Sequence, residues 1–264
     1  MKLGIIAVAS VVMAAGVFCP DAMANQTGVL NLDQVAPYYY DVGGEFTAYV
    51  TSGPQFVQNY SPLATASGGF DTFCIEVEVD FNPGSSFNFA LNPSQSADGT
   101  TLSKGAAYLY YEFATGQLSG YNYANPSAVV PSLGYSDDAE LQAAIWWFQG
   151  NQQYGDGAYP VGANNYYYQL ALSNLGLNSI TAETPENGQF GVEALVLTNP
   201  DGSPAQNQLV YVGIPDKSGT WAMLLLGLAG LAAFARAADR FGARKPALQP
   251  CRVSAKRNPP AQIR

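Results

Sequence analysis

The sequence predicts an α+β fold that is mainly β: a single β-rich domain with two or three inserted helices, flanked by an apolar segment at each end. Three observations support this prediction. Short runs of β-branched and aromatic residues are separated by Gly, Pro and Ser, as in strands joined by turns. A few longer stretches have apolar residues at helical spacing. Between the terminal segments lie about 190 residues, enough for one sizeable core.

Taken in order, the patterns predict strands at both ends of the domain and helices in its middle. Strands are expected over 47–57, 70–81, 190–197 and 208–213, and helices over 102–113, from Asp137 up to Gly150, and over 164–177. The middle helix has the clearest start, because Asp137 and Glu140 resemble a capping box and suit the helix dipole. The pair Gly150-Asn151 is expected to end it.

The N-terminal segment has the three parts of a secretory signal. Lys2 gives the positive start, 3–18 the apolar stretch, and Ala22-Met23-Ala24 the small-residue cleavage site. A retained membrane anchor is the alternative, but the apolar run is short for a bilayer span. We therefore expect residues 1–24 to be a signal peptide and 25–213 to be the exported domain.

Charge separates this domain from the C-terminal tail. Residues 25–213 contain seventeen Asp and Glu and one basic residue, Lys104. From Lys217 onward there are nine basic residues and one acid, Asp239. An acidic body repels nucleic acid and anionic lipid, so neither is expected as a partner. Basic residues after an apolar run favour a cytoplasmic position for that end.

The C-terminal segment resembles a PEP-CTERM sorting signal of the Val-Pro-Asp-Ser-Gly type. It joins a short motif, an apolar run over 221–235 that is expected to be a transmembrane helix, and a basic cluster. The motif residues are Ile214, Pro215, Asp216, Ser218 and Gly219, and the basic anchor residues are Arg236, Arg240, Arg244 and Lys245.

The resemblance implies export to the cell surface or extracellular matrix, with processing of 214–245 by an exosortase-type transpeptidase. Ile214 and the inserted Lys217 depart from the usual motif, and a basic tail, 246–264, continues beyond it. A plain tail anchor is the alternative. The stretch 65–215 also resembles a common body type of PEP-CTERM proteins, which implies envelope association.

Cys74 is the lone cysteine of the exported domain. Cys19 leaves with the signal peptide, and Cys251 lies beyond the expected membrane segment, so no disulfide partner is available. On a strand, Cys74 alternates with apolar neighbours and falls on the polar side with Glu76, Glu78 and Asp80. An ordinary small buried residue remains the alternative interpretation.

The motifs around Cys74 and Gln142 resemble the thioester domains of bacterial surface adhesins. Phe73-Cys74-Ile75 fits the aromatic-Cys motif. "LQAAIWW" fits the Thr-Gln-x-Ala-aliphatic-Trp motif from Gln142 to Trp146, with Leu141 where the family often has Thr. The resemblance implies a Cys74–Gln142 thioester covered by Trp146 and Trp147, and hence covalent adhesion to an amine-bearing surface ligand. Such a bond acts once, so no enzyme activity and no cofactor are expected.

Two other interpretations stay open. Glu76, Glu78 and Asp80 could bind Ca²⁺, although a solvated acidic face accounts for them as well and no Asp-x-Asp-x-Asp-Gly loop is present. The many Tyr and Trp residues could stack on an envelope polysaccharide, which makes a non-covalent matrix-binding or structural protein the alternative function. The absence of His excludes His-based triads and most zinc sites.

Overall fold

The computed structural model describes residues 26–35, 44–56, 69–92, 99–129, 135–151 and 162–213, together with 227, 230 and 231. The chain divides into two units, Met1–Pro215 and Asp216–Arg264, and the elements below belong to the first. The predicted signal peptide lies outside the described residues, as do the sorting motif and the basic anchor. Within the described ranges, no helix is long and apolar enough to cross a membrane.

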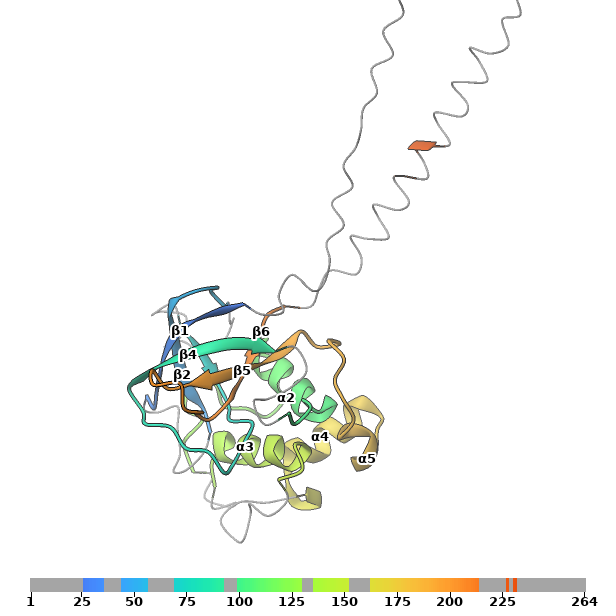
Figure 1. Cartoon of the computed structure of the whole chain (residues 1–264). Helices are drawn as coiled ribbons and strands as arrows, with labels where there is room; N and C mark the ends of the chain where they lie inside the picture. The colour runs from blue at the N-terminus through green and yellow to red at the C-terminus, as the bar shows by residue number, and fades with distance from the viewer. Residues whose placement is uncertain are drawn as a thin grey trace, which may run out of the picture. The chain divides into compact units, whose positions relative to one another are not determined.

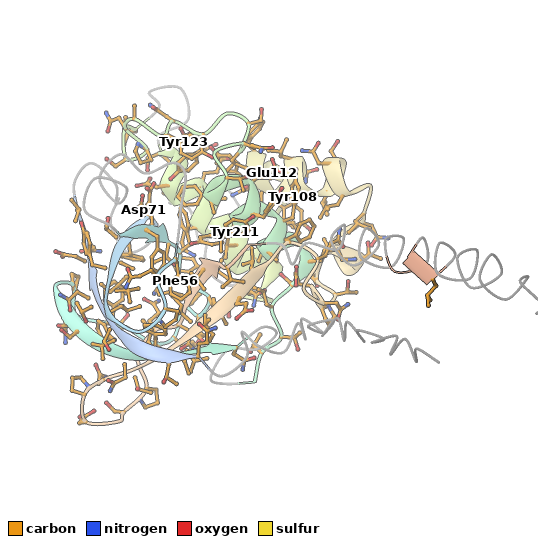
Figure 2. The ribbon with its side chains drawn as sticks, turned by 90° about the horizontal axis from the view of Figure 1, so that it is seen from above. Phe56, Asp71, Tyr108, Glu112, Tyr123 and Tyr211 are labelled. Carbon is orange, nitrogen blue, oxygen red and sulfur yellow. The ribbon has the colours of Figure 1, made fainter. Side chains whose placement is uncertain are left out.

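Six antiparallel strands form one curled sheet (Figure 1). They are β1 (Thr27–Asp33), β2 (Phe46–Ser52), β3 (Phe70–Thr72), β4 (Ser85–Asn92), β5 (Val192–Thr198) and β6 (Gln208–Tyr211). The sheet order is β3-β2-β1-β4-β5-β6, and the chain just after β3 returns to pair with β6. This last pairing joins the two edges of the sheet into a near-barrel, whose strands curl around packed side chains (Figure 2).

The helices of the domain that lie in the described ranges are inserted between β4 and β5. They are α2 (Lys104–Ala114), α3 (Asp137–Phe148), the 3₁₀ turn η2 (Gly162–Asn164), α4 (Tyr166–Leu175) and the short α5 (Ser179–Ala182). Ser103 caps α2 and Asn165 caps α4, each by accepting a main-chain N–H of the first turn. The helices α2, α3 and α4 pack on one another, and α2 also contacts β5 and β6.

The sheet separates two apolar clusters. The inner cluster fills the near-barrel and includes Leu30, Phe46, Phe70, Phe87, Leu197 and Val210. The outer cluster lies between sheet and helices and includes Phe73, Leu109, Ile145, Phe148 and Leu209. Because strand residues alternate between faces, neighbours in sequence enter different clusters. The sheet is therefore covered on both sides at β3, β5 and β6, whereas one face of β1 and β4 is partly exposed.

The structure confirms the α+β class and the inserted helices, but not the predicted dominance of β structure. In the described ranges the α-helices contain about as many residues as the strands. The predicted strand 70–81 is also wrong in length, since β3 ends at Thr72. After Thr72 the main chain pairs with β6 on one side only. On its other side, the side chain of Gln142 takes the place of a neighbouring strand.

Candidate functional site

The seam of the near-barrel lies at Cys74, which forms an antiparallel bridge with Gln208. The flanking main-chain hydrogen bonds are Ile75 N to Asn207 O at 3.0 Å and Leu209 N to Phe73 O at 3.1 Å. Because the neighbours make these bonds, Cys74 and Gln208 are a non-hydrogen-bonded pair, in which facing side chains come closest. Both side chains therefore point to the same face of the seam.

Gln208 holds its side-chain amide against the Cys74 sulfur. Its Nε2 lies 3.4 Å from Sγ and 3.2 Å from the carbonyl oxygen of Gln206. Its Oε1 is buried and has no hydrogen-bond partner within the described ranges. Leaving a buried amide oxygen unpaired costs about 1–3 kcal/mol, so this orientation keeps the two contacts of Nε2 at the expense of Oε1. The amide carbon, one bond from Nε2, is thereby held close to the sulfur.

Gln142 also contacts Cys74, but through the main chain. From α3, its Oε1 accepts the Cys74 N–H at 2.9 Å and its Nε2 donates to the Cys74 carbonyl at 2.9 Å. The amide oxygen and nitrogen of Gln142 thus both bond to the N–H and C=O of Cys74, which make no hydrogen bond to β6. The structure brings together the two residues that the thioester motifs paired, while the amide beside the sulfur is that of Gln208.

The surroundings of Cys74 are apolar, which corrects the expected polar face. Cys74 is fully buried in the inner cluster, together with Phe70 and Trp146. The polar-face prediction fails because the sheet is covered on both sides up to Glu76. Of the two predicted cover residues, Trp146 shares the cluster of Cys74, whereas Trp147 packs against the outer cluster.

The thiol is poorly suited to ionise in this position. Burial raises the pKa of Cys74 well above its usual range, and the charges of Glu76 and Asp80 raise it further. The hydrogen bond from Gln208 acts in the opposite direction. Burial is the larger cause of this rise in pKa, and the acidic neighbours add to it.

Glu76 fixes the segment that carries Gln208. Its carboxylate accepts the Asn207 main-chain N–H at 2.8 Å and also the side-chain amide of Asn207, while its carbonyl accepts from Gln206 at 2.9 Å. Glu78 and Asp80 are exposed, so the three carboxylates of the predicted Ca²⁺ alternative differ in their environments. Within the described part of the chain, no group of three acidic, Cys or His side chains could hold a metal ion.

A buried carboxylate cluster lies in the same domain and has no signal in the sequence. Glu45, Asp71 and Asp138 are nearly or fully buried. The Tyr121 hydroxyl donates to Glu45 at 2.5 Å, and the Thr47 hydroxyl donates to Asp71 at 3.1 Å. Burial raises the pKa of Glu45 well above its ordinary value, with the Asp71 charge adding to it, and raises the pKa of Asp138 to about 6.

Comparison with protein-family models, with curated proteins and with solved structures finds no match to this chain.

Proposed function

We propose that this chain is an exported cell-surface or extracellular-matrix protein that attaches covalently to an amine through an internal thioester at Cys74. The observation that carries the proposal is the 3.4 Å contact between the Cys74 sulfur and the Gln208 amide, inside an apolar interior. Adhesion through one irreversible bond needs neither a cofactor nor repeated turnover.

The reaction needs only these two side chains. The Cys74 sulfur attacks the side-chain carbonyl carbon of Gln208, a C–S bond forms and the C–N bond breaks. The thiol proton leaves with the nitrogen as ammonia, and the Gln206 carbonyl, which already accepts a hydrogen bond from that nitrogen, can keep accepting one as it departs. A primary amine of the partner then attacks the thioester carbonyl. An amide to the Gln208 side chain forms, and Cys74 regains its proton as a free thiol.

We favour Gln208 over Gln142 as the acyl group. The Gln142 amide is held by two hydrogen bonds to the Cys74 main chain, and moving it to the sulfur would break both. The Gln208 amide already contacts the sulfur and would lose one hydrogen bond to a main-chain carbonyl. Gln142 is then a positioning residue, and its own crosslink to Cys74 stays a prediction.

The interior also suits the lifetime of such a bond. A thioester hydrolyses when water reaches it, and both Cys74 and Gln208 are fully buried. Trp146, which shares the cluster with Cys74, would restrict access from the side of α3. The partner amine must therefore enter through local opening of the domain.

Export and sorting form the second half of the proposal. The signal-like residues 1–24, the acidic domain 25–213 and the PEP-CTERM-like segment 214–245 support a path across the membrane with transient anchoring by a transmembrane helix over 221–235. Replacing Pro215 and Asp216 by Ala should retain the protein in the membrane fraction of an exosortase-bearing host. Release equal to that of the unchanged chain would contradict this assignment.

The mass of the mature protein, purified without amines, tests the thioester. We expect a mass one ammonia below the value for the mature sequence, and full mass in Cys74→Ser and in Gln208→Glu. Methylamine should add one methylamine to this mass, so that the product is one methylene group heavier than the mature sequence, and it should make Cys74 open to alkylation after unfolding.

The Gln206→Ala variant is the matched control, because Gln206 is buried beside Gln208 but its side chain bonds to the Glu76 carbonyl instead of the sulfur. It should keep the mass deficit. A deficit that survives Gln208→Glu and disappears in Gln142→Ala would transfer the bond to Gln142. Full mass in the unchanged protein, with Cys74 alkylated on unfolding, would leave an ordinary buried cysteine and end the proposal.

A further inference from the structure

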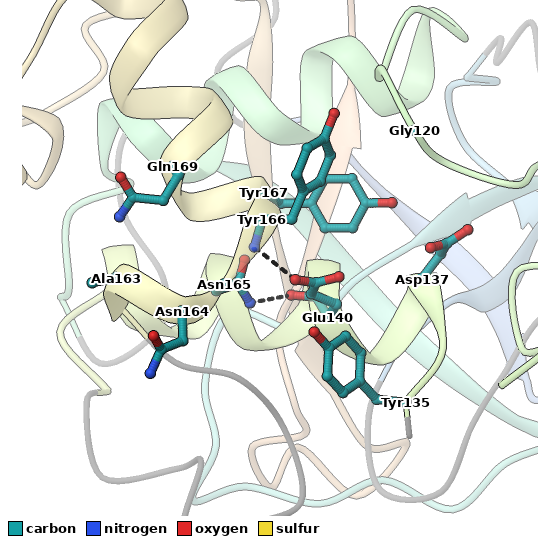
Figure 3. A pocket seen from close by; sticks show the side chains of 10 residues that line it. All are labelled: Gly120, Tyr135, Asp137, Glu140, Ala163, Asn164, Asn165, Tyr166, Tyr167 and Gln169. Carbon is teal, nitrogen blue, oxygen red and sulfur yellow. Dashed lines mark hydrogen bonds between the residues drawn. The ribbon is translucent and has the colours of Figure 1, made fainter. Parts of the chain in front are cut away.

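An open groove of about 590 Å³ lies between the first turns of α3 and α4 (Figure 3). This volume is within the usual range of small-molecule sites, about 300–1,000 Å³. Its wall combines tyrosine rings, two carboxylates and side-chain amides, contributed chiefly by Tyr135, Asp137, Glu140, Asn164, Tyr166 and Gln169. The proposed thioester uses none of these residues.

Tyr166 gives the groove a preformed aromatic wall. Its side chain is 46% exposed, which sets it apart from most of the large hydrophobic residues in the described ranges. The ring is nonetheless fixed by packing: it meets Tyr167 edge-on, with centroids 5.2 Å apart, and lies against Gly120. A Cβ at Gly120 would lie only 3.0 Å from the ring. An exposed ring held in this way offers a flat surface at little entropic cost.

The polar groups of the groove are partly unused. Glu140 is 3% exposed, and its Oε1 accepts the Tyr166 main-chain N–H at 2.6 Å. Its Oε2 makes no hydrogen bond to the described part of the chain, and Figure 3 shows the carboxylate among the groove residues. The exposed side-chain amides of Asn164 and Gln169 also have no partner within the described ranges. These groups are available to a ligand.

The charge and chemistry of these groups narrow the ligand class. No lining residue is basic, so an anionic ligand would meet only repulsion. Asp137 is engaged, since its Oδ2 accepts the Asn122 N–H at 2.8 Å and its carboxyl group also hydrogen-bonds the Tyr167 side chain. The groups left for a ligand are then Oε2 of Glu140 and the two side-chain amides. Amides both donate and accept, as sugar hydroxyls do, whereas an ammonium group requires acceptors alone.

We propose that this groove binds a neutral saccharide, with the Tyr166 ring stacked on the apolar face of a sugar and Glu140, Asn164 and Gln169 bonded to its hydroxyls. The site is separate from Cys74 and does not rest on the thioester. It would give the protein a reversible contact with a polysaccharide matrix, whatever happens at the seam.

Saturation-transfer NMR and calorimetry on the purified full chain test the proposal, with cellopentaose, maltopentaose and mannopentaose as neutral probes. We expect at least one to bind. Tyr166→Ala should weaken its binding about tenfold, the value of one aromatic contact, whereas Tyr166→Phe should bind normally. Gln169→Ala should weaken binding by a smaller factor.

Two control variants distinguish binding in this groove from binding elsewhere on the domain. Tyr49→Ala removes a partly exposed tyrosine on β2, far from the lining residues in sequence, and should leave binding unchanged. Cys74→Ala should also bind normally. Binding of glucosamine or lysine without binding of any neutral probe would make the groove an ammonium site and overturn the proposal. Neutral-probe binding that Tyr166→Ala leaves intact, or no binding by any of the three, would overturn it as well.

Discussion

At the scale of single residues, Cys74 is distinguished by its neighbours and not by its burial. A small apolar cluster is where an ordinary structural cysteine would lie. An ordinary structural cysteine does not require the amide of Gln208 to turn toward its sulfur. This orientation leaves the buried Oε1 of Gln208 unpaired. The orientation of Gln208 therefore argues for chemistry at this position more strongly than the cysteine does.

At the same seam, the side chain of Gln142 bonds to the Cys74 main chain where a neighbouring strand would otherwise pair with it. This structural role can be tested separately from the thioester. Gln142→Ala would leave the buried N–H and C=O of Cys74 without their partners. Each lost partner costs about 1–3 kcal/mol, so we expect a loss of about 2–6 kcal/mol in the free energy of unfolding. Urea unfolding of the full chain measures it. Gln169→Ala, on the exposed face of α4, is the matched control, and an equally small effect of both changes would contradict the role.

At the scale of elements, the contact between α2 and α3 depends on a glycine. A Cβ at Gly105 would lie 2.6 Å from the Phe148 ring. That ring is held in turn by stacking on Tyr168, with centroids 4.6 Å apart. Helix propensity alone predicts that Gly105→Ala stabilises α2 by about 1 kcal/mol. We expect instead a destabilisation of about 1–3 kcal/mol from overpacking, measured by thermal unfolding. A raised melting temperature would show that Phe148 can move aside.

The helices were predictable because their signals are local. α2, α3 and α4 agree closely with the predicted helices, since apolar spacing acts within each segment. Ser103 and Asn165 cap α2 and α4, but the capping box predicted at Asp137 is wrong: the N-cap of α3 is Ser136, which makes no side-chain cap bond. The strand β4 was missed although Phe87, Phe89 and Leu91 alternate, because polar Ser and Asn fill its other face. β1 was missed for a similar reason, having Gly28 and Asn31 among its residues.

The candidate site was predicted only in part, because its geometry is not local. The motifs singled out Cys74 and Gln142, which do meet in space. Gln208 was assigned to a strand, but no sequence signal indicates that β6 pairs with the chain after β3. The closure of the sheet decides which amide faces the sulfur, and that closure depends on contacts far apart in the chain.

At the scale of the whole molecule, the domain over residues 25–213 carries an excess of acidic side chains with almost no cations to balance it. Lys104 is the single basic residue in 25–213. Burial raises the pKa of several carboxyl groups, including Glu45, Asp138 and Glu193. A carboxyl group whose pKa is raised on folding binds protons more tightly in the folded state. The domain should therefore be more stable in mild acid than at neutral pH.

Asp138 gives this expectation a definite window and direction. Its pKa rises from an ordinary 3.8 to about 6 in the folded chain, chiefly through burial. The stabilising contribution is present in full below the unfolded pKa and is lost as the pH rises through the folded value. Between about pH 4 and pH 6 the free energy of unfolding should fall by about 2–3 kcal/mol for this residue alone.

Asp138→Asn should flatten this dependence of stability on pH, because the amide can keep the Ser136 and Ala139 contacts at its oxygen without ionising. Glu78→Gln, at an exposed side chain, should leave it unchanged. Denaturant unfolding across this range measures the slope. A stability that rises from pH 4 to pH 6 would contradict the buried-acid account of the domain.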